Sequence, residues 1–106
     1  MPKYLVYGSY SAEGAKGVLK NGGTARANAV RQAVEGMGGT MESFYFAFGK
    51  EDAIVLVDLP DNVAAAALGL TVSSTGLAAT RTTVLLTPEE IDQSAALTVS
   101  YTPPGQ

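Results

Sequence analysis

A few tyrosines and arginines and one aspartate carry most of the chemistry available to this chain of 106 residues. A phenol can donate or accept a proton, a guanidinium can hold a carboxylate through two parallel hydrogen bonds, and a carboxylate can act as a base. Such groups, if they lined one cavity, would bind or act on a small organic molecule. The candidates are Tyr7, Tyr10, Tyr45, Arg26, Asp58 and Arg81.

Arg26 stands near the start of a predicted helix, just after the glycine pair Gly22-Gly23. Free backbone amides and the helix dipole favour an anion there, and arginine would add a bidentate partner for a carboxylate or phosphate. An arginine on a helix can equally be solvated or paired with a nearby glutamate. Arg26 is therefore a ligand-binding candidate, with surface pairing as the alternative.

Asp58 ends an apolar strand and, by alternation, lies on the same side of it as Ile54 and Leu56. A carboxylate held among apolar side chains is suited to take up a proton near neutral pH, so Asp58 and Tyr7 are the candidates for catalysis. A helix is predicted to begin just downstream. Capping of that helix, shared with Asp61, is the simpler role for Asp58 and the one that we favour.

The tyrosines of the first predicted strand divide by alternation: Tyr4 and Tyr10 share one face and Tyr7 points to the other. Tyr7 and Tyr45 could offer hydroxyls to a ligand, although packing in the core is the simpler interpretation. Arg81 begins the last predicted strand. It could bind a ligand or pair with an acid across an interface between two copies.

The composition removes most other catalytic chemistry. The chain has no cysteine and no histidine, which excludes disulfides, thiolate nucleophiles, imidazole metal ligands, histidine-ligated haem and a Ser-His-Asp triad. No glycine spacing matches a nucleotide-binding loop, and no serine stands in a nucleophile elbow. We expect no metal and no cofactor. Seven basic against ten acidic residues, a net charge of −3, also argue against nucleic-acid binding.

The elements that must position these residues alternate along the chain. Apolar and β-branched runs predict strands at residues 3–10, 40–48, 52–59 and 80–86, and helical spacing predicts helices at 11–20, 24–37, 61–75 and 88–97. The second of these helices is expected to bury Ala27, Val30, Val34 and Met37, and the third Val63, Ala67, Leu70 and Ser74. A flexible tail, or one docked on a partner, is expected at residues 101–106.

The two middle strands predict a hairpin that is apolar on both faces. If Phe48 pairs with Ala53, then Phe46 faces Val55 and Phe44 faces Val57. Tyr45, Leu56, Ala47 and Ile54 line the other face. A sheet with one solvated face does not need this second apolar side, which therefore needs a cover.

The order strand, helix, strand, strand, helix, strand is that of the ferredoxin-like βαββαβ fold, an α+β fold with an antiparallel four-stranded sheet and helices on one face. An extra C-terminal helix follows. Charged residues make up 16% of the chain, against about 25% in an ordinary soluble domain. We expect a single domain over residues 1–106 that forms a homodimer through its open sheet face, a dimeric α+β barrel, or a higher homo-oligomer.

Several blocks of the sequence resemble the GYD domain family over nearly the whole chain. They are residues 1–6 (MPKYLV), 8–14 (GSYSAEG), 22–23 with Arg26, 44–49 (FYFAFG), 58–61 (DLPD) and 82–90 (TTVLLTPEE). The resemblance implies the dimeric α+β barrel superfamily and no established activity for the family itself. Larger members of that superfamily include cofactor-free oxygenases, haem-degrading enzymes, lactone isomerases and ligand-sensing domains, which use a cavity between the sheet and its helices.

The family's signature at the hairpin is glycine, any residue, tyrosine, aspartate. The stretch here reads Gly49-Lys50-Glu51-Asp52, so Glu51 stands at the tyrosine position, and a role that needs that phenol does not carry over. Gly49 and Asp52 keep what a turn needs, namely backbone freedom and a carboxylate that accepts backbone amides. We favour a turn role over a catalytic one for Asp52.

Two functions fit these observations. The first is a homodimeric small-molecule-binding protein, extending to a cofactor-independent enzyme on a small hydrophobic or aromatic carbonyl compound, in which Arg26 orients an acidic group and Asp58 or a tyrosine handles a proton. The second is a non-catalytic structural or regulatory homo-oligomeric assembly domain with its pocket filled by side chains. A cavity of about 300 Å³ with convergent polar groups would favour the first.

The ends and apolar runs of the chain predict its location. The first residues show no signal-peptide pattern. No apolar run approaches the roughly 20 residues that span a bilayer. We therefore expect a cytoplasmic protein without a membrane partner.

Overall fold

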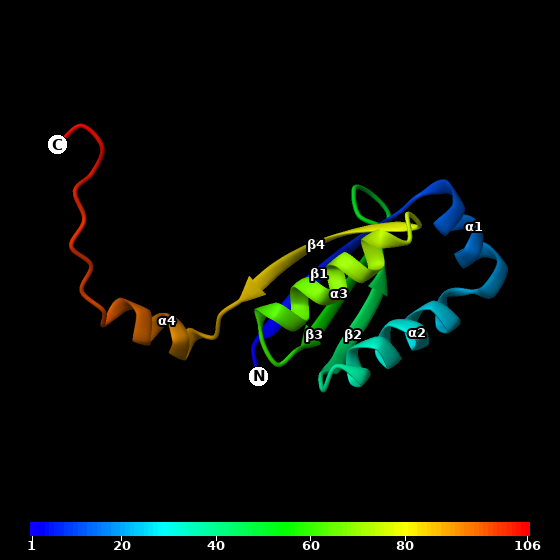
Figure 1. Ribbon diagram of the computed structural model, residues 1–106, viewed down its shortest axis with the longest axis horizontal. Helices are drawn as coiled ribbons and strands as arrows, with labels where there is room; N and C mark the ends of the chain where they lie inside the picture. The colour runs from blue at the N-terminus through cyan, green and yellow to red at the C-terminus, as the bar shows by residue number, and fades with distance from the viewer.

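The computed structural model describes residues 1–106 and contains one sheet and a set of helices (Figure 1). Along the chain the elements are β1 (Lys3–Tyr10), α1 (Ala12–Asn21), α2 (Gly23–Gly36), β2 (Thr40–Phe46), β3 (Ala53–Asp58), α3 (Asn62–Ser74), β4 (Ala78–Leu85) and α4 (Pro88–Ala95). This order confirms the α+β, ferredoxin-like prediction, with α1 and α4 added to the βαββαβ core.

The sheet is antiparallel throughout and has the strand order β2-β3-β1-β4. Alternate residues of β1 and β3 point to one face, where they join residues of α2 and α3 in a single core. The most deeply buried side chains of that core are Tyr4, Val34, Val57 and Leu59. Both helices therefore cover the same face, and the opposite face of the sheet carries no helix.

The two covering helices differ in how well their buried faces could be predicted. On α2 the predicted face is confirmed: Val34 is buried, and Val30 and Met37 pack against the core. On α3 the prediction is wrong, because Ala65 and Leu68 face the sheet while Val63 and Leu70 are 78% and 73% exposed. Since α3 carries apolar residues on nearly every side, its sequence marks no single buried stripe.

The hairpin pairs in a different register from the one predicted. Phe46, not Phe48, pairs with Ala53, and Phe44 pairs with Val55. A β-bulge between Met41 and Ser43 then shifts the register, which strand alternation alone cannot reveal. The observed pairing of Phe44 and Phe46 thus differs by two residues from the predicted pairing. Because strand alternation has a period of two, each side chain still lies on its predicted face.

Short-range capping defines the helix starts. Ser11 accepts from the amide of Gly14 at the start of α1, and Asp61 does so from Ala64 at the start of α3. Thr87 and Glu90 form a reciprocal capping box on α4. These caps fix where α1, α3 and α4 begin, whereas α2, whose N-cap is Gly22, begins without a side-chain cap.

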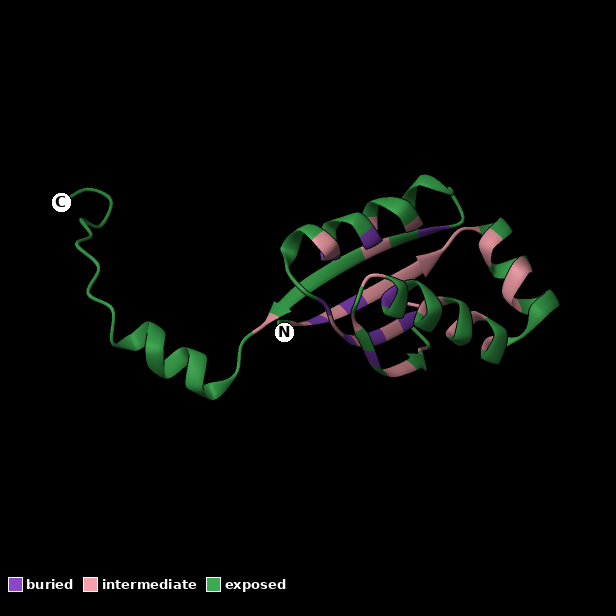
Figure 2. Cartoon of the chain, turned by 60° about the horizontal axis from the view of Figure 1, so that its bottom comes forward, coloured by how far each residue is buried: buried purple, intermediate pink, exposed green.

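Beyond β4 the chain leaves the rest of the fold. Figures 1 and 2 show α4 and the following residues projecting from the end of the sheet, exposed along their whole length. The radius of gyration is 16.9 Å, against about 13 Å for a compact chain of this length. The sheet with α1, α2 and α3 is the part that can enclose a site.

Candidate functional site

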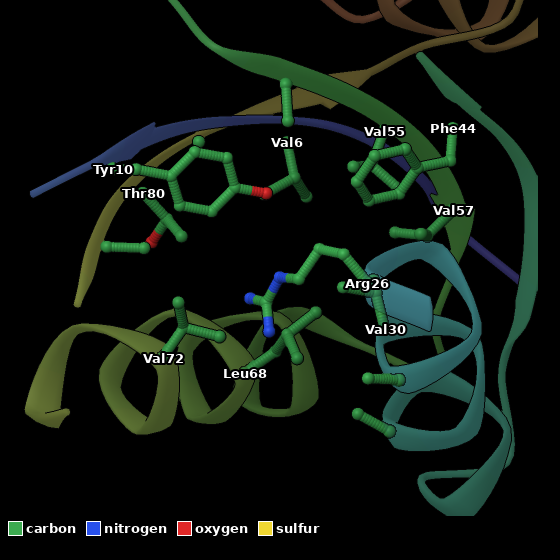
Figure 3. Close-up of a pocket in the computed structure, with 15 residues that line it drawn as sticks. Val6, Tyr10, Arg26, Val30, Phe44, Val55, Val57, Leu68, Val72 and Thr80 are labelled. Atoms are coloured by element: carbon green, nitrogen blue, oxygen red, sulfur yellow. The ribbon is translucent and has the colours of Figure 1, made fainter. Parts of the chain in front are cut away.

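A cavity lies between the sheet and the two helices that cover it (Figure 3). Its inner part, here called the inner chamber, has a volume of about 130 Å³ and is lined by 15 residues, 12 of them hydrophobic. Val6, Phe44 and Val55 line it from the sheet, and Val30 and Leu68 from the helices. The chamber therefore favours an apolar group.

Arg26 brings a positive charge to this apolar space. It lies in the first turn of α2, and its side chain points between β1 and α3 (Figure 3). The guanidinium carbon lies 5.8 Å from the centroid of the Tyr10 ring, within range of a cation–π contact. Its Nε is buried and has no hydrogen-bond partner. A buried donor left unpaired in this way is uncommon and costly, so it calls for an explanation.

No carboxylate neutralises Arg26. The ion pairs of the structure join Lys3 to Glu42 and Asp58, Lys16 to Glu13, and Arg81 to Glu51. The alternative in which Arg26 pairs with a nearby glutamate is therefore absent from the structure. The guanidinium keeps its capacity to bind an anion from outside the chain.

A second, wider chamber adjoins the first. This outer chamber has a volume of about 580 Å³ and lies among α1, the start of α2, and the residues on either side of the α3–β4 connection. It shares Tyr10, Arg26, Ala29, Val72 and Ala78 with the inner chamber. Its remaining lining is more polar and includes Glu13, Asn21, Thr71 and Thr75. Arg26 and Tyr10 thus stand where an apolar chamber meets a polar one.

Tyr7 and Arg81 lie on the other face of the sheet, away from the cavity. The Arg81 guanidinium stacks on the Tyr7 ring, with 4.0 Å between its central carbon and the ring centroid. Arg81 also donates to Glu51 at 3.0 Å, and Ser9 donates to the same carboxylate at 3.1 Å. The hydrogen bond from Arg81 is the main cause that lowers the pKa of Glu51. Glu51 is thus a partner for Arg81.

Asp58 neither caps a helix nor enters the cavity. Asp61 alone provides the side-chain cap of α3. The Asp58 carboxylate instead accepts from Lys3 at 2.9 Å, and Lys3 also donates to Glu42 at 2.6 Å. Hydrogen bonds to Glu42 and then Asp58 raise the pKa of Lys3. The favoured capping role is therefore wrong for Asp58, because β3 ends with this residue pointing to the open face, where Lys3 pairs with it across the strands.

Of the hairpin residues, Asp52 holds the end of β1 and Gly49 belongs to the turn. The Asp52 carboxylate accepts from the backbone amide of Tyr10 at 2.7 Å, and its own amide donates to the carbonyl of Gly8. Gly49 has a φ of 149°, a conformation that favours glycine. Asp52 therefore uses its carboxylate on a backbone amide, as a turn residue would, and in doing so fixes the backbone of Tyr10.

The candidates divide between two places in the fold. Tyr10 and Arg26 come together at the cavity, whereas Tyr7, Arg81, Asp58 and the 70% exposed Tyr45 belong to the open face. Sequence reasoning missed Thr80, which lines the inner chamber opposite Gly8. Strand alternation could have identified Thr80, because it is adjacent to Arg81 in the strand and therefore lies on the opposite, helix-covered face.

No three acidic side chains lie close enough together to hold a metal ion. None of the helices has the length and apolar character needed to cross a membrane.

Comparison with known proteins identifies the family. A family model described as the GYD domain matches residues 4–95. No curated protein and no solved structure matches the chain significantly. The family match covers the sheet, the cavity and α4, and it confirms the resemblance seen in the sequence blocks: the chain belongs to the GYD domain family.

Proposed function

We propose that this protein binds a small organic acid, whose apolar part fills the inner chamber and whose carboxylate pairs with Arg26. The observation that carries the proposal is the buried Nε of Arg26, which has no partner in the chain and lies where the two chambers meet. A bound carboxylate would accept from this donor and neutralise the charge.

The volumes of the two chambers indicate the size of the ligand. The inner chamber, at about 130 Å³, is close to the size of the apolar cavity of about 150 Å³ that accepts a benzene molecule in an engineered protein. It therefore suits an aromatic ring or a short aliphatic chain. The outer chamber, at about 580 Å³, lies within the range of about 300–1,000 Å³ typical of ligand sites and leaves room for a polar extension.

The chemistry of the lining supports binding more strongly than turnover. Tyr10 is the one phenol on the chamber walls, and Asp58, the sequence candidate for a base, lies on the opposite face of the sheet. In the inner chamber any proton transfer on a ligand would fall to Tyr10, which packs beside Arg26. The one carboxylate of the outer chamber, Glu13, is ion-paired with Lys16. The function proposed is accordingly recognition of an acidic small molecule.

Ligand screening tests this proposal. Aromatic and short aliphatic carboxylates should raise the melting temperature of the wild type, and each matched alcohol should not. Arg26→Met should abolish the shift, and Arg31→Met, on the same helix but exposed, should retain it. Equal shifts in both variants would remove Arg26 from the site. Native mass spectrometry of protein isolated from its own host would identify the molecule.

We also propose that two copies associate through the open sheet face. Leu5, Ile54 and Leu56 lie there beside Tyr7 and the exposed Tyr45, and no element of the same chain covers them. Sedimentation should give at least twice the mass of the 10.9 kDa chain, and Leu56→Glu, which removes the sheet-face contact alone, should lower that mass. A wild type that sediments as a monomer at micromolar concentration would contradict this association.

A further inference from the structure

The segment after β4 makes no hydrogen bond or ion pair with the rest of its own chain. We call residues 87–106 the arm. Its hydrogen bonds stay within it, and Figures 1 and 2 show it apart from the sheet and fully exposed. Its apolar side chains are open to solvent: Ile91 is 51% exposed, Leu97 73%, Val99 79% and Tyr101 70%.

An isolated arm of this kind would not hold its helix. Helix α4 has 8 residues, and isolated helices shorter than about 12–15 residues are marginal in water even when well capped. Its capping box supplies part of the stability, but a packing surface is still required. The chain's own body, residues 1–86, does not supply one in this structure.

The exposed area indicates how much surface awaits a partner. The chain exposes 7191 Å², whereas a compact monomer of 10.9 kDa exposes about 5,600 Å². The excess of about 1,600 Å² is about twice the 800 Å² that each partner buries in a standard stable interface. A standard interface through the open sheet face would bury about half of this excess area, which leaves area for a second interface.

The connection between β4 and α4 contains no tight turn. Thr87 stands between the end of β4 and Pro88 and has an extended backbone, with φ −76° and ψ 160°. A residue before proline is disfavoured in the helical region, so this connection stays extended. No glycine or asparagine stands between Leu85 and Pro88 to form a tight reversal. The exit from β4 therefore directs α4 away from the sheet that precedes it.

A second uncovered apolar surface lies on the outside of α3. Val63, Ala67 and Leu70 are exposed along one side of this helix, opposite the residues that pack on the sheet. The helix, NVAAAALGLTVSS, carries no charged residue. A helix that is apolar all round is usually covered on every side. The outer stripe of α3 thus needs a cover that the open sheet face, on the other side of the molecule, cannot provide.

We infer that the arm crosses to a second copy of this chain, where α4 packs on the outer stripe of α3. A second copy is the fitting partner because each chain carries one arm and one stripe, so a twofold pair satisfies both. Charge permits the exchange: Glu89, Glu90 and Asp92 account for the whole net charge of −3, which leaves the body neutral and without repulsion toward the arm. The exchange is independent of the proposed ligand site.

Paramagnetic NMR on mixed chains tests the exchange. Since the chain lacks cysteine, Leu97→Cys gives a single site for a nitroxide label. Labelled chains at natural isotope abundance are mixed with unlabelled ¹⁵N chains, so that any broadening is intermolecular. The amides of residues 63–70 in the ¹⁵N chains should lose most of their intensity. Broadening that occurs only when label and ¹⁵N share one chain, broadening at another surface, or none at all would overturn the inference.

A matched pair of variants in the ¹⁵N chain separates docking from folding. Leu70→Glu should remove the intermolecular broadening, and Leu19→Glu should not, because Leu19 is an exposed apolar residue of α1 outside the stripe. Retained broadening in Leu70→Glu would exclude α3 as the docking surface. Arg26→Met, the ligand-site variant, should leave the broadening unchanged. The arm exchange and the ligand binding can therefore fail independently of each other.

Discussion

Replacement of Arg26 by methionine should stabilise the protein in the absence of ligand. The buried, unpartnered Nε costs about 1–3 kcal/mol of folding free energy, which an apolar side chain of similar length does not incur. The contact with Tyr10 at 5.8 Å, worth about 0.5–1 kcal/mol, is lost. The net gain is about 1 kcal/mol, because methionine keeps the packing of the arginine stem.

Denaturant and thermal unfolding measure this gain. A stabilisation of 1 kcal/mol raises the melting temperature of a domain near 100 residues by about 4–8 °C. The matched control is Arg31→Met, in which an exposed arginine that bonds only to Asn28 is replaced; its effect should stay within about 0.5 kcal/mol. If Arg26→Met lowered the free energy of unfolding by 1 kcal/mol or more while Arg31→Met left it unchanged, Arg26 would be a structural residue. The argument that its guanidinium is there to bind a ligand would then fail.

Three further substitutions test other parts of the account. Ala29→Phe, at the junction of the chambers, should weaken carboxylate binding by at least about tenfold, or 1.4 kcal/mol, with the fold retained; calorimetry that shows undiminished affinity would contradict the position of the site. Gly39→Ala should cost about 1–3 kcal/mol in urea unfolding, because a Cβ there would meet the Asp58 carbonyl and come within 2.9 Å of Leu59; an unchanged midpoint would show that the backbone can move. Because Arg81 lowers the pKa of Glu51 in the folded state, the pair stabilises the protein above the ordinary glutamate pKa of about 4.3 and less as pH falls below it. Glu51→Gln should therefore lower the melting temperature at pH 7 and flatten its acid dependence, and parallel curves for the two proteins would refute this.

The fold was predictable because local signals and strand alternation agree. The start of α1 after Ser11 and the capping box of α4 follow from side chains adjacent in sequence. The face of each β1 tyrosine follows from its position in the strand. Where two faces were equally apolar, as on α3, the sequence held no information to choose between them.

The site was only half predictable, because it depends on contacts between distant segments. Arg26 could be selected from its place at a helix start, and Tyr10 from its alternation with Tyr4. The pairing of Asp58 with Lys3 depends on strand register, which no local pattern specifies. The partner of Arg81 depends on the path of the hairpin, which brings Glu51 across to it.

Direct observation of the Arg26 guanidinium is the sharpest test of the central claim. The chain has three arginines, Arg26, Arg31 and Arg81. Each of their Nε–Hε NMR signals can be assigned by replacing the corresponding arginine with lysine. On titration with benzoate or a short aliphatic carboxylate, the Arg26 signal should shift in a saturable way while those of Arg31 and Arg81 stay in place. An Arg26 signal that does not move, or three signals that move together, would contradict recognition of an organic acid at this site.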